Sequence, residues 1–209
     1  MNSASRVVPG IDRPDVGTVM SSEWTVHSPQ RQRKALDLQA EVWGEADWPE
    51  GLHSYTFYAG TDGSTILHYS QWRDDQAYRD FVESGRKPRM ERVDAAVPGI
   101  ERHDLAFYRL HRSLTIGSDE PGIVVTEFVA AGGPDDARRR VGTMADAREK
   151  ARPSGLLTAG FHVSSDGSRI LDYSEWTDDA AFEAYLAPQQ DTGSRRIKRF
   201  RPYRSLRGA

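Results

Sequence analysis

The sequence predicts an α+β protein built from two tandem copies of one βαββαβ unit. The main observation is an internal repeat: residues 61–79 read TDGSTILHYSQWRDDQAYR, and residues 165–183 read SDGSRILDYSEWTDDAAFE. Asp62 and Asp166 take the same place in these segments, which gives an offset of 104 residues (166 minus 62). Self-similarity at a fixed offset is typical of a duplicated unit. A chain of 209 residues accommodates two domains of ordinary size.

The first copy reads in order as strand, helix, strand, strand, helix and strand. Ser28-Pro29 is an N-cap followed by a proline at the first helical position. Asp62-Gly63 is a hairpin turn signal between two strands. The expected strands are residues 16–26, 52–59, 65–72 and 100–110, and the expected helices run from 29 to about 46 and onward from 74.

The second copy repeats this order. Its expected strands are residues 123–129, 156–163, 169–176 and about 197–206, and its helices are 134–150 and 178–187. The predicted organisation is a disordered leader (1–13), a first repeat (14–112), a linker (113–121) and a second repeat (122–209).

The order βαββαβ is the ferredoxin-like arrangement. Its helices cover only one face of a four-stranded sheet, and a bare apolar face is unfavourable. We therefore expect the two halves to pack sheet to sheet as an intrachain pseudo-dimeric α/β barrel. Further association of the chain into a homo-oligomer is left open.

Composition restricts the function classes. With 37% hydrophobic and 28% charged residues the chain is typical of a soluble globular protein, and a net charge of −3 argues against a general polyanion binder. The absence of cysteine excludes disulfides and thiolate metal sites, and the six histidines show no metal-ligand spacing. No apolar run approaches the roughly 20 residues of a membrane helix. We expect a cytoplasmic protein without a metal, and neither nucleic acid nor membrane as partner.

The arginine-rich segment 195–207 has two interpretations. It is typical either of a phosphate-binding strip or of an edge strand that charge protects against aggregation. The net acidic chain favours the edge strand.

The candidate site residues follow from the alternation along 65–72. His68 and Trp72 share one face of this strand, and Tyr69 points to the other. Tyr78 lies at inner spacing on the following helix. Each also has a structural interpretation, because a tryptophan or tyrosine here is often core and a lone histidine is usually a hydrogen-bonded core or surface residue.

The run His68-Tyr69-Ser70-Gln71-Trp72, followed by Gln76-Ala77-Tyr78-Arg79, resembles the antibiotic biosynthesis monooxygenase family, the small quinone-forming oxygenases of aromatic polyketide pathways. The preceding turn at 61–63 matches as well. The resemblance implies single ferredoxin-like domains that pair into an α/β barrel. It implies oxidation of anthrone-type phenols by molecular oxygen, with no metal, flavin or haem cofactor.

Carried over by position, the resemblance places Trp72 at the carbonyl side of the substrate. Tyr69 and Tyr78 would hydrogen-bond the ring system. The family also uses an arginine after the second helix, which Arg92 or Arg89 supplies here.

At position 68 the family has asparagine, and this chain has His68, a group that takes or gives protons near neutral pH. His68, Trp72 and Tyr78 are thus the predicted catalytic residues. Tyr69, Arg92, Asp172 and Trp176 are the predicted substrate-binding residues.

The two copies are predicted to be functionally unequal. The positions of His68, Trp72 and Tyr78 carry Asp172, Trp176 and Phe182 in the second copy, so we expect the first to hold the working pocket. The alternative is that both cavities bind, with Asp172 as a base whose pKa is raised by burial.

Three other functions are weighed. A non-catalytic ligand-binding or stress-related barrel would use the same pocket, and a polyketide cyclase on this fold would look alike. Haem degradation in this fold would need an asparagine on the first strand and a histidine after the second helix, and residues 79–100 contain no histidine.

Overall fold

The computed structural model describes residues 8–188 and 196–208. The fold is mixed α/β with antiparallel strands, and most elements begin and end within about two residues of the predicted bounds. The largest differences are that the first strand starts two residues later, the fourth extends five residues further, and a helix over 87–96 was not predicted. In chain order the elements are β1 (Thr18–Thr25), α1 (Pro29–Glu45), β2 (Leu52–Gly60), β3 (Thr65–Trp72), α2 (Asp75–Phe81), the π-helical turn η1 (Val82–Arg86), α3 (Lys87–Ala96), β4 (Glu101–Thr115), β5 (Ile123–Ala130), α4 (Pro134–Ala151), β6 (Leu156–Ser164), β7 (Arg169–Trp176), α5 (Asp179–Leu186) and β8 (Arg196–Arg207).

The chain divides into two compact units that do not coincide with two contiguous halves. Unit 1 comprises Met1–Pro9, Arg13–Phe107 and Pro202–Ala209, and unit 2 comprises Gly10–Asp12 and Tyr108–Arg201. The strands β4 and β8 each contribute residues to both units. The predicted boundaries at 112 and 122 therefore differ from the structure, since β4 continues to Thr115 within the expected linker. That the halves are copies of one unit, and how they pack, stay predictions.

The expected leader is ordered over its described part. Val8 and Ile11, both placed by prediction in a disordered segment, are 0% and 4% exposed. Apolar side chains gain free energy when they leave water, which holds this stretch against the protein. Residues 1–7 lie outside the described part of the chain.

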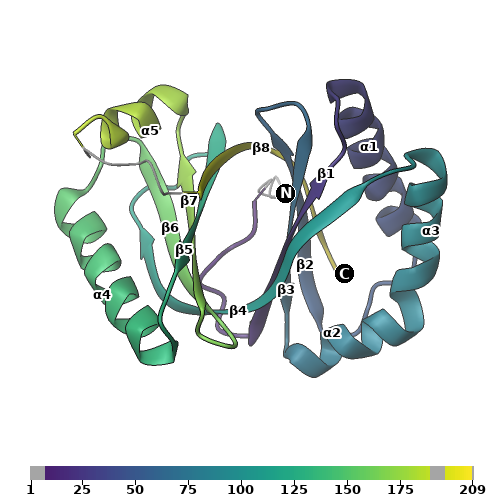
Figure 1. The fold of residues 1–209 in the computed structure, drawn as a ribbon, viewed down its shortest axis with the longest axis horizontal. Coiled ribbons are helices and arrows are strands. Elements are labelled where there is room, and N and C mark those ends of the chain that lie inside the picture. The colour runs from purple at the N-terminus through teal and green to yellow at the C-terminus, as the bar shows by residue number, and fades with distance from the viewer. Residues whose placement is uncertain (1–7, 189–195, 209) are drawn as a thin grey trace, which may run out of the picture. The chain divides into compact units, whose positions relative to one another are not determined.

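In unit 1 the strand order is β1-β3-β2-β8, and the helices gather on one face of the strands (Figure 1). The register places Ser22 of β1 and Phe57 of β2 on either side of His68. Because successive side chains alternate between faces, His68, Ser70 and Trp72 point toward the helices.

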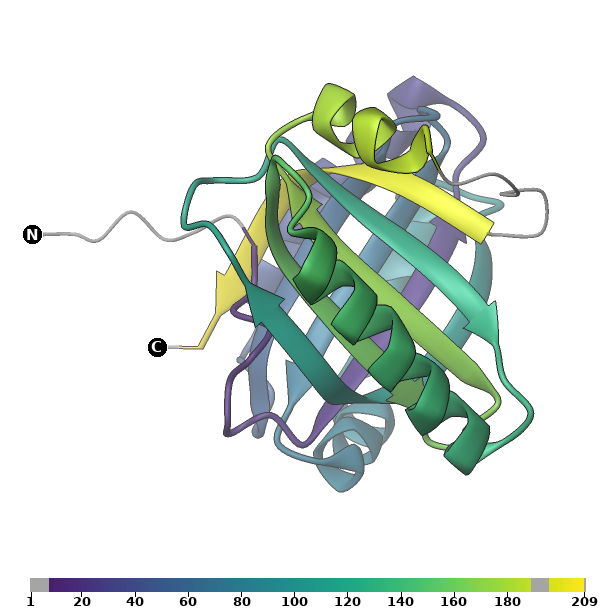
Figure 2. The same ribbon diagram turned by 90° about the vertical axis from the view of Figure 1, so that its left-hand side faces the viewer.

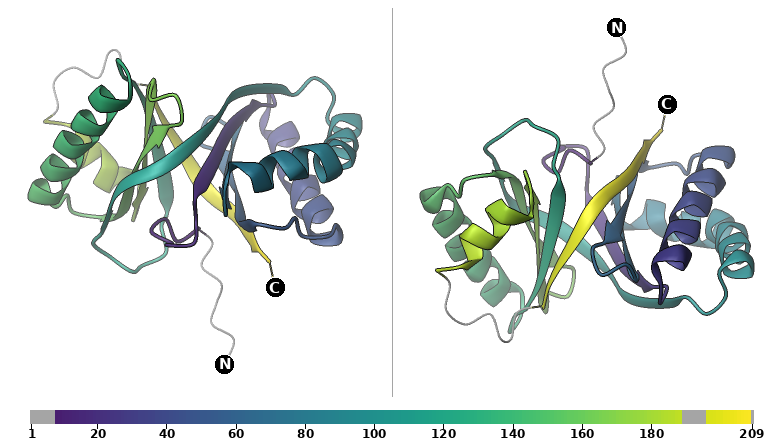
Figure 3. Two further views of the ribbon diagram at one scale, coloured as in Figure 1. Left: turned by 90° about the horizontal axis from the view of Figure 1, so that it is seen from below. Right: turned by 90° about the horizontal axis from the view of Figure 1, so that it is seen from above.

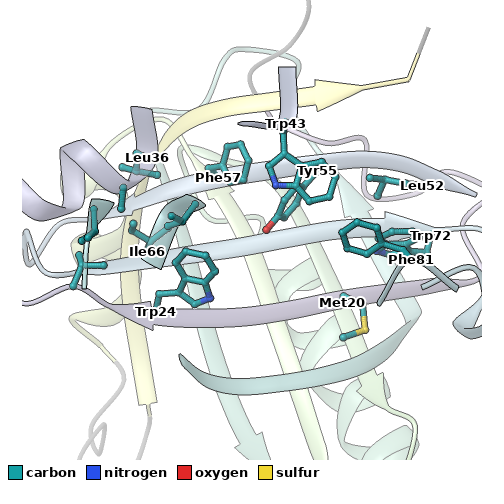
Figure 4. Close-up of a cluster of buried hydrophobic side chains, with 14 of the residues drawn as sticks. Met20, Trp24, Leu36, Trp43, Leu52, Tyr55, Phe57, Ile66, Trp72 and Phe81 are labelled. Atoms are coloured by element: carbon teal, nitrogen blue, oxygen red, sulfur yellow. The ribbon is translucent and has the colours of Figure 1, made fainter. Parts of the chain in front are cut away.

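A buried apolar cluster fills the space between this sheet and its helices. Figure 4 shows Trp43 of α1 beside Tyr55 of β2, and Trp72 of β3 beside Phe81 of α2. The ring centroids of Trp43 and Tyr55 are 4.4 Å apart. Aromatic rings bury large areas in well-defined orientations, so this layer is both stable and rigid.

Local signals fix the ends of these helices. The Ser28 side chain accepts a hydrogen bond from the backbone of Arg31, and Asp74 accepts one from Ala77 at 2.8 Å. The buried Gln32 amide of α1 donates to two backbone carbonyls at the hairpin between β2 and β3, at 2.9 and 2.7 Å. The hairpin and α1 are therefore held together. Gly63 in the turn has φ +71°, as the predicted Asp-Gly signal requires.

In unit 2 the strand order is β8-β5-β7-β6-β4, with α4 and α5 lying across one face (Figure 2). Its core contains Phe161, Trp176 and Phe182. The views in Figure 3 likewise show the helices of each unit on a single side of that unit's strands.

The C-terminal arginines of β8 that the structure describes are partly neutralised within unit 2. Arg199 contacts Glu183 at 2.6 Å, and Arg201 contacts Asp179 at 2.9 Å, both on or at the start of α5. This supports a structural role for these charges over a phosphate-binding strip. Among the described residues, no helix has the length and apolarity needed to cross a membrane.

Candidate functional site

A cavity lies between the sheet of unit 1 and its helices, with about 50 Å³ open to the centres of water-sized molecules. It draws one to three side chains from each of eight elements, so it depends on the fold and not on one loop. Its lining consists of Met20, Ser22, Trp24, Trp43, Tyr55, His68, Ser70, Trp72, Tyr78, Phe81, Arg86, Met90 and Leu105.

The structure brings the three predicted catalytic residues together in this cavity. His68 and Trp72 reach it from β3, as the alternation predicted, and Tyr78 reaches it from α2. The capping aspartate Asp74 starts α2 directly after β3, which turns Tyr78 back over Trp72. The centroids of these two rings are 5.3 Å apart in an edge-to-face arrangement.

His68 is buried, with 2% of its surface exposed. Its Nδ1 lies 2.9 Å from the Tyr55 hydroxyl, and its Nε2 has no hydrogen-bond partner in the protein. The Trp24 ring lies 4.2 Å from the imidazole, and the Arg102 guanidinium lies over the Trp24 ring at 4.5 Å. Burial, followed by the positive charge of Arg102, lowers the pKa of His68 to about 3. The imidazole is therefore neutral at physiological pH.

Trp72 contributes its ring to the cavity lining, and its indole N–H already donates a hydrogen bond within the protein. Its Nε1 donates to Ser70 Oγ at 2.8 Å. The expected contact of Trp72 with a substrate carbonyl would therefore have to come from the ring or through Ser70. Ser70 accepts from Trp72 and retains its own O–H, so it offers a donor to the cavity.

Arg86 is a lining residue that the sequence pattern did not indicate. It is the last residue of the π-helical turn η1. Burial raises the pKa of the Tyr78 phenol, and the charge and hydrogen bond of Arg86 oppose that rise. Gly85 inside a helical segment, shortly before Pro88, is the sequence signal of an irregular helix that could have directed attention to this turn.

The two arginines that were predicted for this role lie elsewhere. Arg92 is on the surface, where it pairs with Glu41 and Glu45 at 3.2 and 2.8 Å. Arg89 is buried behind the Trp43 ring and donates to the carbonyls of Gly85 and Asp47, both at 2.6 Å. Neither lines the cavity, whereas Arg86 at the end of the π-helical turn η1 does.

Tyr69 also lies away from the cavity. It is 1% exposed and, by alternation along β3, points to the face opposite His68 and Trp72. The predicted contact of Tyr69 with a substrate in this cavity does not fit that placement.

Asp172 and Trp176 belong to unit 2, where they occupy the corresponding strand β7. Trp176 donates to Ser174 at 2.9 Å, the bond that Trp72 makes in unit 1. Asp172 forms a buried ion pair with Arg148 of α4 at 2.7 Å. The space beside this pair is only about 10 Å³, room for one water at most. The Arg148 side chain fills the corresponding space, so these residues form a packed core with little room for a ligand.

Among the described residues, no group of three or more histidines, aspartates and glutamates is arranged to hold a metal ion.

Comparison with known proteins gives matches at the level of structure. No family model and no curated protein matches the sequence. An anthrone oxidase-like protein superposes with a TM-score of 0.72 at 18% identity, covering 93% of this chain and 94% of that chain. A candidate monooxygenase of Fusobacterium nucleatum gives 0.61 at 9% identity, covering 94% and 97%. A ferredoxin-fold protein from Listeria monocytogenes, related to antibiotic biosynthesis monooxygenases, gives 0.52 at 11% identity, covering 90% and 96%.

The similarity is one of fold. The chain shares the architecture of monooxygenase-like proteins over nearly its full length, which agrees with the fold that the motif around Trp72 implied.

Proposed function

We propose that the protein is a cofactor-independent monooxygenase that oxidises an electron-rich phenol or anthrone to a quinone with molecular oxygen. The support is the unit 1 cavity, which combines aromatic walls with N–H and O–H donors and one guanidinium. Its described lining contains no carboxylate. Such an environment favours a bound oxygen anion over a neutral or cationic ligand.

The reaction balances without another reactant. An anthrone methylene loses two hydrogens and gains one oxygen, which is a four-electron oxidation. Molecular oxygen accepts these four electrons; one oxygen atom becomes the new carbonyl and the other leaves as water with the two hydrogens. The substrate thus supplies every electron, and no flavin, haem or external reductant is required.

The role of the protein is to bind the substrate as its enolate or phenolate. Trp24, Trp72 and Tyr78 present rings against which a flat substrate can stack. Ser70 and His68 supply donors, and Arg86 supplies positive charge beside the Tyr78 hydroxyl. An anion held by such groups transfers an electron to oxygen more readily than the neutral phenol does.

The cavity in its present form is smaller than a three-ring substrate. A polycycle enters only if the rim side chains move, and the rim contains the exposed Leu105 together with the half-buried Arg86 and Met90. We expect the substrate's outer ring to occupy the space where these side chains now lie, with the reacting ring against Trp72.

Oxygen uptake by the purified, metal-free protein against a panel of anthrones and polycyclic phenols tests the proposal. We expect substrate-dependent uptake of one O₂ per quinone formed and no product under anaerobic conditions. Conversion that continues without oxygen would identify a cyclase or another tailoring activity. Tight binding of the same compounds without oxygen uptake would identify a binding protein.

A further inference from the structure

Tyr55 reaches the same cavity but has no part in the reaction described above. It stands on β2, it is 9% exposed, and its hydroxyl lies 2.9 Å from Nδ1 of His68 in a buried contact. Burial raises the pKa of the Tyr55 phenol, so its proton stays in place at neutral pH.

The contact indicates which nitrogen of His68 carries the proton. A buried O–H group needs an acceptor, and Nδ1 of His68 is the partner the structure gives to the Tyr55 hydroxyl among the described residues. A neutral imidazole has one acceptor and one donor nitrogen. If Nδ1 accepts from Tyr55, the proton lies on Nε2.

The Nε2 atom of His68 is available to a ligand in the cavity. It is buried and has no hydrogen-bond partner in the protein, while His68 is part of the cavity lining. A buried N–H without a partner costs free energy, and a ligand oxygen that accepts its hydrogen bond would recover that energy.

We propose that Tyr55 is a positioning residue that holds His68 in the tautomer protonated on Nε2, and that this N–H donates to the oxygen anion of the bound substrate. The inference rests on the proposed function for the identity of the ligand, but the tautomer itself does not depend on catalysis. His68 thus acts as a fixed hydrogen-bond donor and not as the base expected from its ordinary pKa.

The surroundings of His68 favour a donor over a base. A base would become an imidazolium that the Arg102 charge opposes, next to the Trp24 ring on which Arg102 lies and the hydrophobic Phe57 ring. These neighbours supply no negative charge to a cation at this position. A donor needs no change of charge, so its hydrogen bond costs no reorganisation when the anion forms.

Nitrogen NMR of the ¹⁵N-labelled protein reports the tautomer directly. We expect His68 to show a protonated Nε2 and an unprotonated Nδ1, with its signals assigned by their loss in His68→Gln. In Tyr55→Phe we expect this preference to weaken. The matched control is Tyr58→Phe, which removes a buried hydroxyl from the same strand on the face away from His68. A proton on Nδ1 in the wild-type protein would overturn the inference.

Binding of a stable phenolic quinone, 1,8-dihydroxyanthraquinone, separates this inference from the proposed function. We expect a change in the His68 Nε2–H signal in the wild-type protein, with or without turnover of any anthrone. Binding that leaves this signal unchanged would refute the donor role, whereas absent oxygen uptake alone would refute only the oxygenase.

Kinetics distinguish a donor from a base where turnover is measurable. Glutamine at position 68 keeps an N–H donor but cannot act as a base, so His68→Gln should retain most of kcat, while His68→Phe should lose about 10- to 100-fold. Tyr55→Phe should lower kcat roughly 3- to 10-fold with a smaller change in KM. If glutamine and phenylalanine are equally inactive in folded protein, the donor role is wrong.

Discussion

Trp72 and Trp176 show how one residue type with one local bond serves two purposes. Both donate their indole N–H to the serine two positions earlier, at 2.8 and 2.9 Å. Both rings are buried, at 1% and 0% exposed, but Trp72 with Tyr78 lines the cavity of unit 1, whereas Trp176 packs against Phe182 and Tyr185 and does not line the small space beside Asp172. The difference in surroundings, and not the tryptophan itself, decides where a ligand can bind.

Parallel substitutions test this assignment. Trp72→Phe combined with Tyr78→Phe should abolish turnover, because it removes the indole face and the phenol of the cavity. Trp176→Phe should leave turnover nearly intact, since it removes the same serine-bonded indole from a packed core. Circular dichroism and steady-state oxygen uptake check both variants. Loss of activity only in Trp176→Phe would reverse the assignment, and equal loss would indicate two working sites.

Buried neutral histidines make stability depend on pH. Burial lowers the pKa of His68 to about 3 and that of His162 to about 4, against ~6.5 in an unfolded chain. Between these values the unfolded state binds more protons than the folded state. The contribution of the two histidines to the free energy of unfolding is therefore fully present above about pH 6.5 and decreases as the pH drops.

Urea unfolding at several pH values between 7 and 4.5 measures this dependence. Each histidine contributes a slope of up to about 1.4 kcal/mol per pH unit. We expect His68→Gln and His162→Asn each to flatten the curve. His111→Gln, which changes an exposed histidine, is the control. A curve that the buried substitutions leave unchanged would contradict the neutral state of these rings.

At the scale of elements, the π-helical turn η1 between α2 and α3 contributes the arginine that lines the cavity. A π-turn changes the angular position of every residue that follows it, and such turns are frequent at functional sites. Here it directs Arg86 into the cavity, while Arg89 packs behind Trp43 and Arg92 points to solvent.

Two arginine substitutions compare these positions. Arg86→Met should raise KM for a phenolate substrate about tenfold or more, because a charge-assisted contact of roughly 1.5–3 kcal/mol is lost. Arg92→Met should leave KM unchanged, since its surface ion pairs contribute little. Steady-state kinetics above and below the substrate's phenol pKa provide the measurement. A larger effect of Arg92→Met than of Arg86→Met would show that Arg92 binds the substrate, as the sequence resemblance implied.

The Arg148–Asp172 pair between α4 and β7 makes a prediction about stability. Asp172→Asn leaves Arg148, which is only 5% exposed, without its anion, and should cost about 3–5 kcal/mol of unfolding free energy. The double variant Arg148→Met with Asp172→Leu should be near neutral or more stable, because it removes both charges. Chemical denaturation measures the free energy of unfolding of both variants. A double variant as unstable as Asp172→Asn would show that the ion pair itself stabilises the fold, beyond neutralising the buried charge of Arg148.

On the scale of the whole molecule, the regular elements were predictable because their signals are local. The Ser28 cap, the Asp62-Gly63 turn and the alternation along β3 each determine structure within a few residues. The Arg86 position was not predictable, because a π-turn depends on packing that a helical pattern does not encode. The bond between Tyr55 and His68 joins two strands, and propensities do not report such pairs.

Electron balance predicts how the whole protein should behave as a catalyst. If the substrate supplies all four electrons, as in the proposed reaction, activity should survive chelators, and active preparations should lack flavin and haem absorption. With ¹⁸O₂, one labelled atom should enter the quinone. A stoichiometric metal whose removal abolishes turnover, or a flavin band that follows activity through purification, would contradict the mechanism.

The assignment of Pro202–Ala209 to unit 1 has a genetic consequence. Within unit 1, Ser205 bonds Thr56 of β2 at 2.8 Å, and the Tyr203 hydroxyl bonds Asp37 of α1. A premature stop codon or frameshift at or shortly after codon 202 would therefore remove the end of β8 from the unit whose cavity residues are encoded at codons 20–105. Nonsense alleles in this stretch should behave as lesions of the N-terminal unit, and a chain truncated after residue 112 would lack part of that unit's own sheet.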